Sequence, residues 1–301
     1  MAAVDTDTPR EAAAAQESIF RRNLQSFAGN RLALGSAIVV FLFILMAIFA
    51  PLVAPHDPAE TDLFRRLQPP AWMPGGEWSY LLGCDALGRD ILSRIIYGAR
   101  ISIFIGTAVV MVATTIGIIA GLAAGYLRGW VDTVISRVVD ILLGFPYLIF
   151  AIGLMAMMGP GLINIILALV YKEWVIPCRV VRGETLATRE LEYVEAARAL
   201  GASGRHIMLH EILPNILSPV IVVSTIRMAH VIILEASLSF LGLGVQPPTA
   251  SWGAMVADGR AFILQAWWVS TFPGIAILLL VLAINVASQG LRDAFDPRFH
   301  E

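Results

Sequence analysis

Residues 192–215, EYVEAARALGASGRHIMLHEILPN, form a polar stretch that is rich in side chains able to make charged hydrogen bonds. Its carboxylate and guanidinium groups can form charge-assisted hydrogen bonds, which are stronger than neutral ones. Glu195 and Arg198 would fix the register of the stretch on a partner surface. Ala196 and Ala197 are small, so a helix that carries them can sit in a shallow cleft. The chemistry that this pattern favours is docking against another surface.

The polar stretch is expected to contain one short helix. Thr188 can cap its start, because a threonine hydroxyl accepts a hydrogen bond from the free backbone N–H groups there. Gly201 suits its end, since glycine readily adopts the positive φ found after a helix C-terminus. A helix of about 12 residues is unstable alone in water and needs a surface to pack on. The alternative is an ordinary solvated loop helix of mixed charge.

The sequence lacks motifs for catalysis and for metal binding. A phosphate-binding loop of the type GxxxxGK[ST] needs a lysine, and Lys172, the only lysine, lies in LVYKEWV, which has no glycine. The motifs HExxH and GxSxG are also missing. Cys84 and Cys178 lack metal-ligand spacing and are expected on opposite sides of a membrane, so no disulfide is predicted. We therefore predict no catalytic residue, no metal site and no cofactor bound by this chain.

The rest of the chain has the composition of a membrane protein. Hydrophobic residues make up 57% of the 301 residues and charged residues 15%, where a soluble domain has about 25% charged residues. A transmembrane helix needs about 20 apolar residues. Six apolar runs predict an all-α protein with six transmembrane helices, at residues 32–53, 101–127, 133–158, 161–181, 212–241 and 268–290. The net charge of −2 gives no indication of a nucleic-acid partner.

Arginine is more frequent in the loops on one side of these runs than on the other. By the positive-inside rule both termini are cytoplasmic, and the polar stretch lies in a cytoplasmic loop. The predicted order is a cytoplasmic segment at 1–31, a first transmembrane helix at 32–53, an external loop at 54–100, a five-helix core at 101–292 with a cytoplasmic loop at about 183–211, and a cytoplasmic tail at 293–301.

Three ionisable residues, Arg227, His230 and Glu235, lie within the predicted fifth span. Charges at membrane depth are costly and usually face the bundle interior or a water-filled path. One interpretation places Arg227 and Glu235 on a substrate passage, where Glu235 would meet a positively charged amino group. The alternative is that they pair across helices and hold the bundle or a subunit interface. His230 has no second metal ligand at helical spacing beside it.

Glycine and proline also mark two of the spans. Gly117, Gly121 and Gly125 are four residues apart, so they form a groove on one helix face where a neighbouring helix can approach closely. Pro214 and Pro219 fall in the first turns of the fifth span, where the missing N–H groups can kink a helix. We expect the first feature to serve packing and the second to transmit motion from the polar stretch.

Several segments in order resemble the second permease subunit of importers of the ATP-binding-cassette (ABC) type, in their dipeptide and oligopeptide (peptide/nickel) branch. They are LGCDALGRDILSRIIYGARIS, VRGETL, EAARALGAS, ILPN, ASLSFLGLGVQPPTASWGAM and GLRDAFDPR. The resemblance implies the type I ABC importer permease fold in the bacterial inner membrane. It also implies that the Glu-Ala-Ala helix is the coupling helix that docks on an ATPase, with Glu195, Ala196, Ala197, Arg198 and Gly201 as its coupling residues.

The resemblance further implies a set of partners. They are a homologous permease in a heterodimer, two ABC ATPase subunits that bind ATP and Mg, and an external substrate-binding protein. Asp85, Arg89 and Asp90 in the external loop would contact the binding protein, or alternatively form a solvated helix cap. Dipeptides or oligopeptides are the expected substrates, with glutathione, nickel and opines as alternatives. A self-contained secondary transporter is disfavoured, because the two halves of the chain show no internal repeat.

Overall fold

The computed structural model describes residues 27–295, and every named element in this range is a helix. In chain order they are α2 (Arg31–Ile48), α3 (Ala50–Val53), η1 (Leu63–Arg65), α4 (Ile91–Leu127), α5 (Gly129–Gly144), α6 (Tyr147–Met158), α7 (Leu162–Glu173), α8 (Val175–Thr188), α9 (Glu192–Ala199), α10 (Gly204–His206), η2 (Ile207–Ile212), α11 (Leu213–Phe240), α12 (Trp252–Arg260) and α13 (Trp268–Phe295). The η2 segment is a π-helix that joins α10 to α11.

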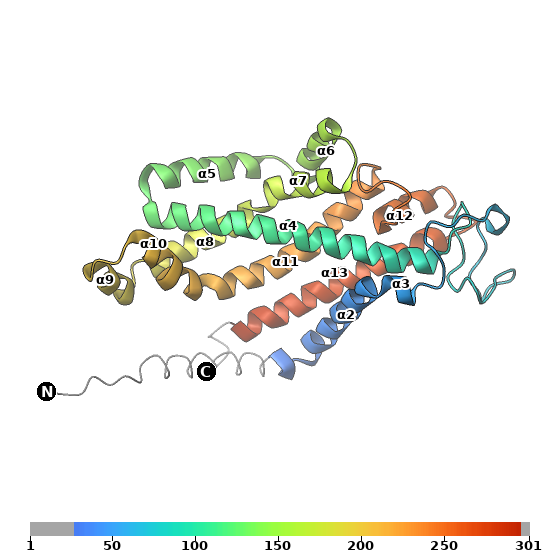
Figure 1. Ribbon diagram of the computed structural model, residues 1–301, viewed down its shortest axis with the longest axis horizontal. Coiled ribbons are helices and arrows are strands. Elements are labelled where there is room, and N and C mark those ends of the chain that lie inside the picture. Colours follow the sequence, from blue (N-terminus) through green and yellow to red (C-terminus); the bar gives the residue numbers. More distant parts are fainter. Residues whose placement is uncertain (1–26, 296–301) are drawn as a thin grey trace.

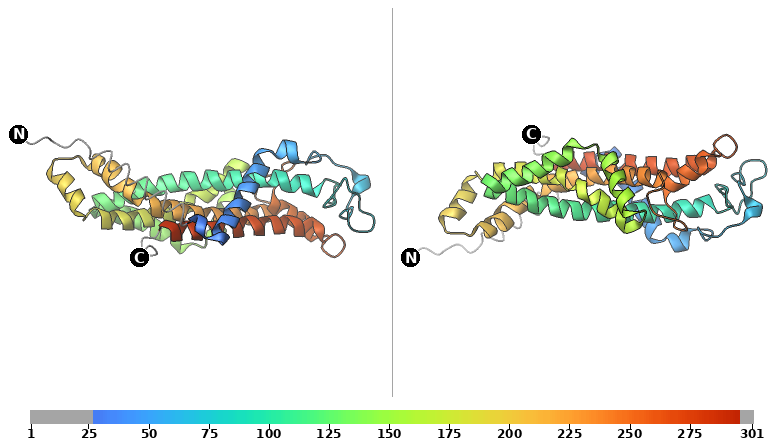
Figure 2. Two further views of the ribbon diagram at one scale, coloured as in Figure 1. Left: turned by 90° about the horizontal axis from the view of Figure 1, so that it is seen from below. Right: turned by 90° about the horizontal axis from the view of Figure 1, so that it is seen from above.

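The long helices lie side by side in an elongated bundle (Figures 1 and 2). α4 packs against α8 and α11, and α13 packs against α11 and α2. One end of the bundle carries α9 and α10, and the other carries the loop of residues 54–90. The 37 residues of α4 cover about 55 Å at 1.5 Å per residue. The polar stretch and the external loop are therefore at opposite ends of the molecule.

Four helical segments are long and apolar enough to cross a membrane: Arg31–Ile48, Ile91–Leu127, Gly204–Phe240 and Trp268–Phe295. α5 and α6 make a fifth if the 92° bend between them lies within one span. The predicted run 161–181 is not among these segments, because it is divided at Trp174 into α7 and α8 and contains several charged residues. The all-helical prediction is confirmed, while the count of six spans stays a prediction.

Two predicted boundaries differ from the helix ends. The first run, 32–53, is interrupted at Phe49, and Pro51 lies in the first turn of the short α3. Residues 91–100, expected in the external loop, belong to α4. Its start is fixed by Asp90, whose carboxylate accepts a hydrogen bond of 2.9 Å from the Ser93 N–H. Such a cap satisfies a backbone donor that the helix itself leaves free.

The predicted glycine groove on α4 is occupied by α8. A Cβ atom on Gly121 would lie 2.6 Å from the Cβ of Val181. Gly117 and Gly125 are equally close to residues of α8, at Pro177 and Thr185. Only hydrogen fits at these three positions, so the prediction of a close helix approach is confirmed.

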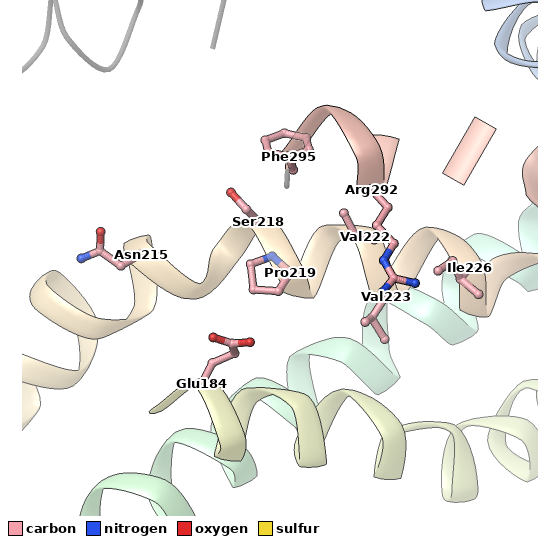
Figure 3. Close-up of a pocket in the computed structure, with 9 residues that line it drawn as sticks. All are labelled: Glu184, Asn215, Ser218, Pro219, Val222, Val223, Ile226, Arg292 and Phe295. Atoms are coloured by element: carbon pink, nitrogen blue, oxygen red, sulfur yellow. The ribbon is translucent and has the colours of Figure 1, made fainter. Parts of the chain in front are cut away.

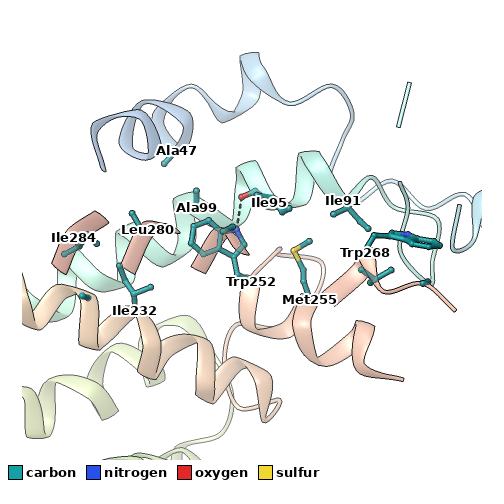
Figure 4. Close-up of a cluster of buried hydrophobic side chains, with 14 residues drawn as sticks. Ala47, Ile91, Ile95, Ala99, Ile232, Trp252, Met255, Trp268, Leu280 and Ile284 are labelled. Atoms are coloured by element: carbon teal, nitrogen blue, oxygen red, sulfur yellow. Dashed lines mark hydrogen bonds between the residues drawn. The ribbon is translucent and has the colours of Figure 1, made fainter. Parts of the chain in front are cut away.

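The largest apolar cluster lies toward the end of the bundle that carries the external loop and joins α2, α4, α11, α12 and α13 (Figure 4). Trp252 at the start of α12 is fully buried within it. Its indole Nε1–H donates a hydrogen bond of 2.9 Å to the Ile95 carbonyl of α4. A buried indole needs such a partner, and the bond fixes α12 against the middle of the cluster.

Candidate functional site

The polar stretch folds into α9, α10, η2 and the first residues of α11. α9 stands at one tip of the bundle (Figure 1). α9 begins at Glu192 and follows Leu191, which has an extended backbone and no capping side chain. The predicted cap at Thr188 is wrong, because Thr188 is the last residue of α8 and is buried. Helical geometry of α8 runs through Thr188, and a turn at Arg189–Leu191 then redirects the chain into α9.

Packing divides α9 into an anchored face and an exposed face. Val194 is fully buried in an apolar cluster with Ile207 and Ile212, and Ala197 packs against the same cluster. Glu195, Ala196 and Arg198 are exposed. Leu200, just after the helix, is 89% exposed, so a docked partner could bury its side chain. The geometry therefore presents charge and small residues on one short helix, with an exposed leucine at its end.

Gly201 ends α9, as its sequence position predicts. Its φ is +87°, a value that residues with a Cβ rarely adopt. The Gly201 N–H donates to the Arg198 carbonyl at 3.0 Å, and the Ala202 N–H donates to the Ala197 carbonyl at 3.1 Å. This pair of bonds is the Schellman motif, which satisfies the last carbonyls of a helix. Gly201 thus fixes where the exposed helix stops.

A direct side-chain link connects α9 to the long helix α11. The Asn215 amide donates a hydrogen bond of 3.1 Å to the Tyr193 hydroxyl of α9 and another of 2.6 Å to the Glu211 carbonyl. Glu211 belongs to the π-helical segment η2, where the Leu213 N–H reaches back to Met208. A π-segment inside a longer helix often marks a functional position.

Arg227 lies on α11 and is paired inside the chain. Its guanidinium makes a bidentate ion pair with Glu173 at the end of α7, with Nη2 2.9 Å from Oε2 and Nε in contact with Oε1. His230 joins the pair, its Nδ1 lying 2.8 Å from Arg227 Nη2. The side chain of Glu173 is almost completely buried. The network ties α11 to the junction of α7 and α8.

Glu235, further along α11, is fully buried. Its carboxylate accepts hydrogen bonds from the Ser102 hydroxyl of α4 at 3.0 Å and from the Ser239 hydroxyl at 2.8 Å. The structure thus does not bring Arg227 and Glu235 into one site. Each is bound to a different neighbouring helix, which favours the alternative that they hold the bundle together.

The side chains of Asp85, Arg89 and Asp90 are buried within the external loop. Asp85 accepts from Arg89 Nε at 2.7 Å and from two backbone N–H groups of its own turn. Asp90 caps α4 and also accepts from the Ser93 hydroxyl at 2.6 Å. The expectation of a solvated cap is therefore corrected: Asp90 does cap the helix, but its side chain is buried. In this chain the three side chains stabilise the loop and do not form its outer surface.

The sequence analysis did not identify the structural roles of two buried residues at the end of α7, Lys172 and Glu173. Lys172, on α7, donates a hydrogen bond to the Phe145 carbonyl at the bend between α5 and α6. Its neighbour Glu173 holds Arg227. The available signal was the pair of opposite charges inside the apolar run 161–181, since such charges normally have partners. The part of the chain that the structure describes holds no group of three or more His, Cys, Asp or Glu residues suited to a metal ion.

Family models match the chain in two places. Residues 113–301 match the model described as a binding-protein-dependent transport system inner membrane component. Residues 18–70 match the model described as the N-terminal transmembrane domain of oligopeptide transport permease C. The two models together include α9, the glycine groove of α4 from Gly117 onward and the first membrane-spanning helix.

Curated relatives match over most of their length. The di/tripeptide transport system permease protein DppC of Pseudomonas aeruginosa is 44% identical over 274 residues, covering 91% of this chain and 90% of the relative. The dipeptide transport system permease protein DppC of Escherichia coli is 44% identical over 275 residues, covering 91% and 92%. A solved structure of the MetNI methionine ABC transporter in inward-facing conformations is 18% identical, with a TM-score of 0.57 and coverage of 68% and 98%. It shares the fold.

Proposed function

The chain belongs to the family of binding-protein-dependent transport system inner membrane components, and from this premise we propose that it imports dipeptides and oligopeptides. As a member it is a permease subunit of an ABC importer, similar to the second permease of the oligopeptide and dipeptide systems. It is a multi-pass protein of the bacterial inner membrane. The relatives at 44% identity are named for di- and tripeptide transport, which supports peptides as the substrate class.

The exposed face of α9 is the observation that carries the proposed mechanism. α9 is the coupling helix, with Glu195, Ala196, Ala197 and Arg198 at the contact with the ATPase and Gly201 at its end. Val194 holds the helix on the bundle, while its other side stays uncovered within this chain. Burying Leu200, which is 89% exposed, would contribute about 1.5–3 kcal/mol to docking.

The proposed assembly contains four kinds of subunit. This chain and a homologous permease form the passage as a heterodimer, two ABC ATPases bind ATP and Mg at the cytoplasmic end, and a substrate-binding protein delivers the peptide outside. Closure of the ATPase pair on ATP moves the coupling helices and opens the passage outward, and hydrolysis resets it. Asp85, Arg89 and Asp90 support outer docking indirectly, by holding the shape of the external loop.

Motion of α9 would reach the passage through α11. The Tyr193–Asn215 bond links the two helices. The π-segment lies directly before α11, and Pro219 lies inside α11 just after Asn215, so the helical hydrogen bonding is irregular on both sides of the link. Arg227 and Glu235 lie further along α11. We place them beside the passage, where their bonds to α7 and α4 hold α11 in position.

The substitution Glu195→Lys tests the coupling assignment. In proteoliposomes that contain the complete transporter, we expect the variant to assemble and hydrolyse ATP, while peptide uptake falls by roughly tenfold or more. The estimate follows from the roughly 2–5 kcal/mol that breaking a desolvated interfacial charge pair costs. Glu195→Asp, which keeps the negative charge at the same position, is the matched control and should retain most of the uptake. Normal uptake by the Glu195→Lys transporter would refute the coupling role.

A further inference from the structure

A cavity of about 700 Å³ lies between α8, α11 and α13, at the end of the bundle that carries α9 (Figure 3). Its charged lining consists of Glu184 from α8 and Arg292 from α13. Glu184 projects toward Pro219, and Arg292 reaches from the opposite side toward Val223. The two charges therefore enter the cavity at different points along α11.

Both charges are left without a partner by the rest of the described chain. Within residues 27–295, neither Glu184 nor Arg292 takes part in an ion pair or a side-chain hydrogen bond. Arg227 and Glu235 differ in this respect, because Glu173 and two serines already occupy them. An acid and a base that line one cavity without pairing are available to a ligand that carries both charges.

The dimensions and the remaining lining fit a short peptide. Glu184 and Arg292 approach α11 near Pro219 and Val223, which are four residues, or about 6 Å, apart along the helix axis. An extended chain covers about 3.3–3.6 Å per residue, so a dipeptide has about the length needed to reach both charges. Between the charges the wall is apolar, with Val222 and Val223. Such a wall accepts many side chains and selects none of them strongly.

We propose that this cavity is a peptide-binding site at the coupling end of the passage, where Glu184 binds the terminal ammonium and Arg292 the terminal carboxylate. The proposal rests on peptide import as the function of the chain and adds the residues that hold the substrate before release. It explains how one site serves peptides of varied sequence, since both recognised groups are common to all of them. Ser218 supplies a hydroxyl near the Glu184 end, and Asn215 supplies only its side-chain oxygen, because its amide NH2 already binds Tyr193 and Glu211.

Protection of an introduced thiol tests the site. Ser218→Cys places a thiol in the cavity with little change in size, and the native Cys84 and Cys178 are buried, so background labelling of this chain is low. The complete transporter is prepared in inverted membrane vesicles and labelled with a small methanethiosulfonate reagent, with and without dialanine. We expect dialanine at ten times its half-protecting concentration to slow labelling about tenfold, because the free fraction of a site falls as 1/(1 + [L]/Kd).

Charge variants and modified ligands identify the groups involved. Glu184→Gln should abolish protection by dialanine, while Asp293→Asn, an acid next to Arg292 that does not line the cavity, should preserve it. N-acetyl-dialanine and dialanine amide, which lack one terminal charge each, should protect less than dialanine. Where the reagent does not reach position 218, Val223→Cys replaces it as the reporter.

Failure of this proposal is distinguishable from failure of peptide import. ATP-driven uptake of dialanine is measured with the binding protein in right-side-out proteoliposomes. Uptake without protection at either reporter, or equal protection in the Glu184→Gln variant, overturns the cavity site alone. Absence of uptake for every peptide tested overturns the proposed function itself, and the cavity site with it.

Discussion

Tyr193 on α9 and Asn215 in the first turn of α11 are joined by a hydrogen bond of 3.1 Å, from the Asn215 amide to the Tyr193 hydroxyl. The same amide also binds the Glu211 carbonyl of the π-segment at 2.6 Å. One side chain thus connects the exposed helix, the irregular segment and the start of the long helix. A displacement of α9 has a direct path to α11 that bypasses the loop of residues 201–203.

Tyr193→Phe should therefore weaken coupling while leaving ATP hydrolysis in place. A single neutral hydrogen bond is worth about 0.5–1.5 kcal/mol, which corresponds to a reduction of roughly two- to tenfold in peptide taken up per ATP. The measurement is simultaneous uptake and phosphate release in proteoliposomes. Tyr97→Phe, in α4 and without a hydroxyl partner among the described residues, is the control. An unchanged uptake-to-hydrolysis ratio for Tyr193→Phe would show that the link does not transmit motion.

Lys172 stabilises the 92° bend between α5 and α6, because its ammonium group donates to the Phe145 carbonyl directly before Pro146. Lys172→Met removes this charged donor from the Phe145 carbonyl. Because a hydrogen bond to a charged group contributes about 1.5–3 kcal/mol, we expect the free energy of unfolding to fall by up to about that amount. Thermal unfolding of the purified chain in detergent measures this loss, and Lys172→Arg, which keeps a donor, should recover part of it. A Lys172→Met protein as stable as the parent would contradict this role.

Local features of the fold were predictable from the sequence, and long-range charge partners were not. The glycine spacing on α4 and the stop at Gly201 each depend on a few neighbouring residues, and the structure confirms both. The partner of Arg227 is Glu173, 54 residues earlier in the chain. No periodicity connects two such positions, because only the packing of α7 against α11 brings them together.

The burial of charged side chains in the external loop was also not predictable from the sequence. Asp85, Arg89 and Asp90 are close in sequence and charged, a pattern that indicates a surface for a partner. In the structure they bind one another, the backbone of their turn and the start of α4, and they are buried. The sequence identifies the charged residues, but it does not show whether their side chains point into the folded loop or out to its surface.

The Glu173–Arg227 pair should show strong energetic coupling. Removing one member of a buried ion pair leaves an uncompensated charge and costs about 3–5 kcal/mol. We expect Glu173→Leu to lose that much stability and Glu173→Leu combined with Arg227→Met to regain most of it. A double-mutant cycle on thermal or denaturant unfolding measures the interaction. Glu77→Gln removes an exposed partner of Arg65 and should change stability by less than about 1 kcal/mol.

Equal losses in the single and the double variant would contradict this expectation. That result would mean that Arg227 finds another partner or reaches water when Glu173 is absent. His230, which lies 2.8 Å from Arg227, is the nearest candidate within the network.

Gly121→Ala should separate α4 from α8. The new Cβ would lie 2.6 Å from the Cβ of Val181, and overpacking of this kind costs about 1–3 kcal/mol. Gly183→Ala is the matched control, since nothing lies within 4 Å of a Cβ there, and alanine in place of glycine stabilises a helix by about 1 kcal/mol. The two alanine variants should thus change the unfolding temperature in opposite directions. A shift in the same direction for both would refute the steric account.

Cys84 should be unreactive in the folded protein. Burial, and secondarily the Asp90 carboxylate, raises the pKa of its thiol from 9.0 to about 12. Only the thiolate reacts, so at about pH 8 roughly one thiol in ten thousand is reactive, against about one in eleven for a cysteine with the ordinary pKa of 9.0. In the Cys178→Ala variant, maleimide labelling followed by mass spectrometry should show no modification of Cys84 until the chain is unfolded.

The same pKa shift predicts how stability depends on pH. Because the folded thiol holds its proton at a higher pH than the unfolded one, its contribution is complete below about pH 9 and is lost between about pH 9 and pH 12. Cys84→Ala should reduce the decline of the unfolding temperature across this alkaline range. Rapid labelling of Cys84 at about pH 8 would show that the external loop opens far more readily than its buried bonds indicate. An alkaline decline that Cys84→Ala leaves unchanged would show that the pKa of this thiol does not differ between the folded and unfolded states.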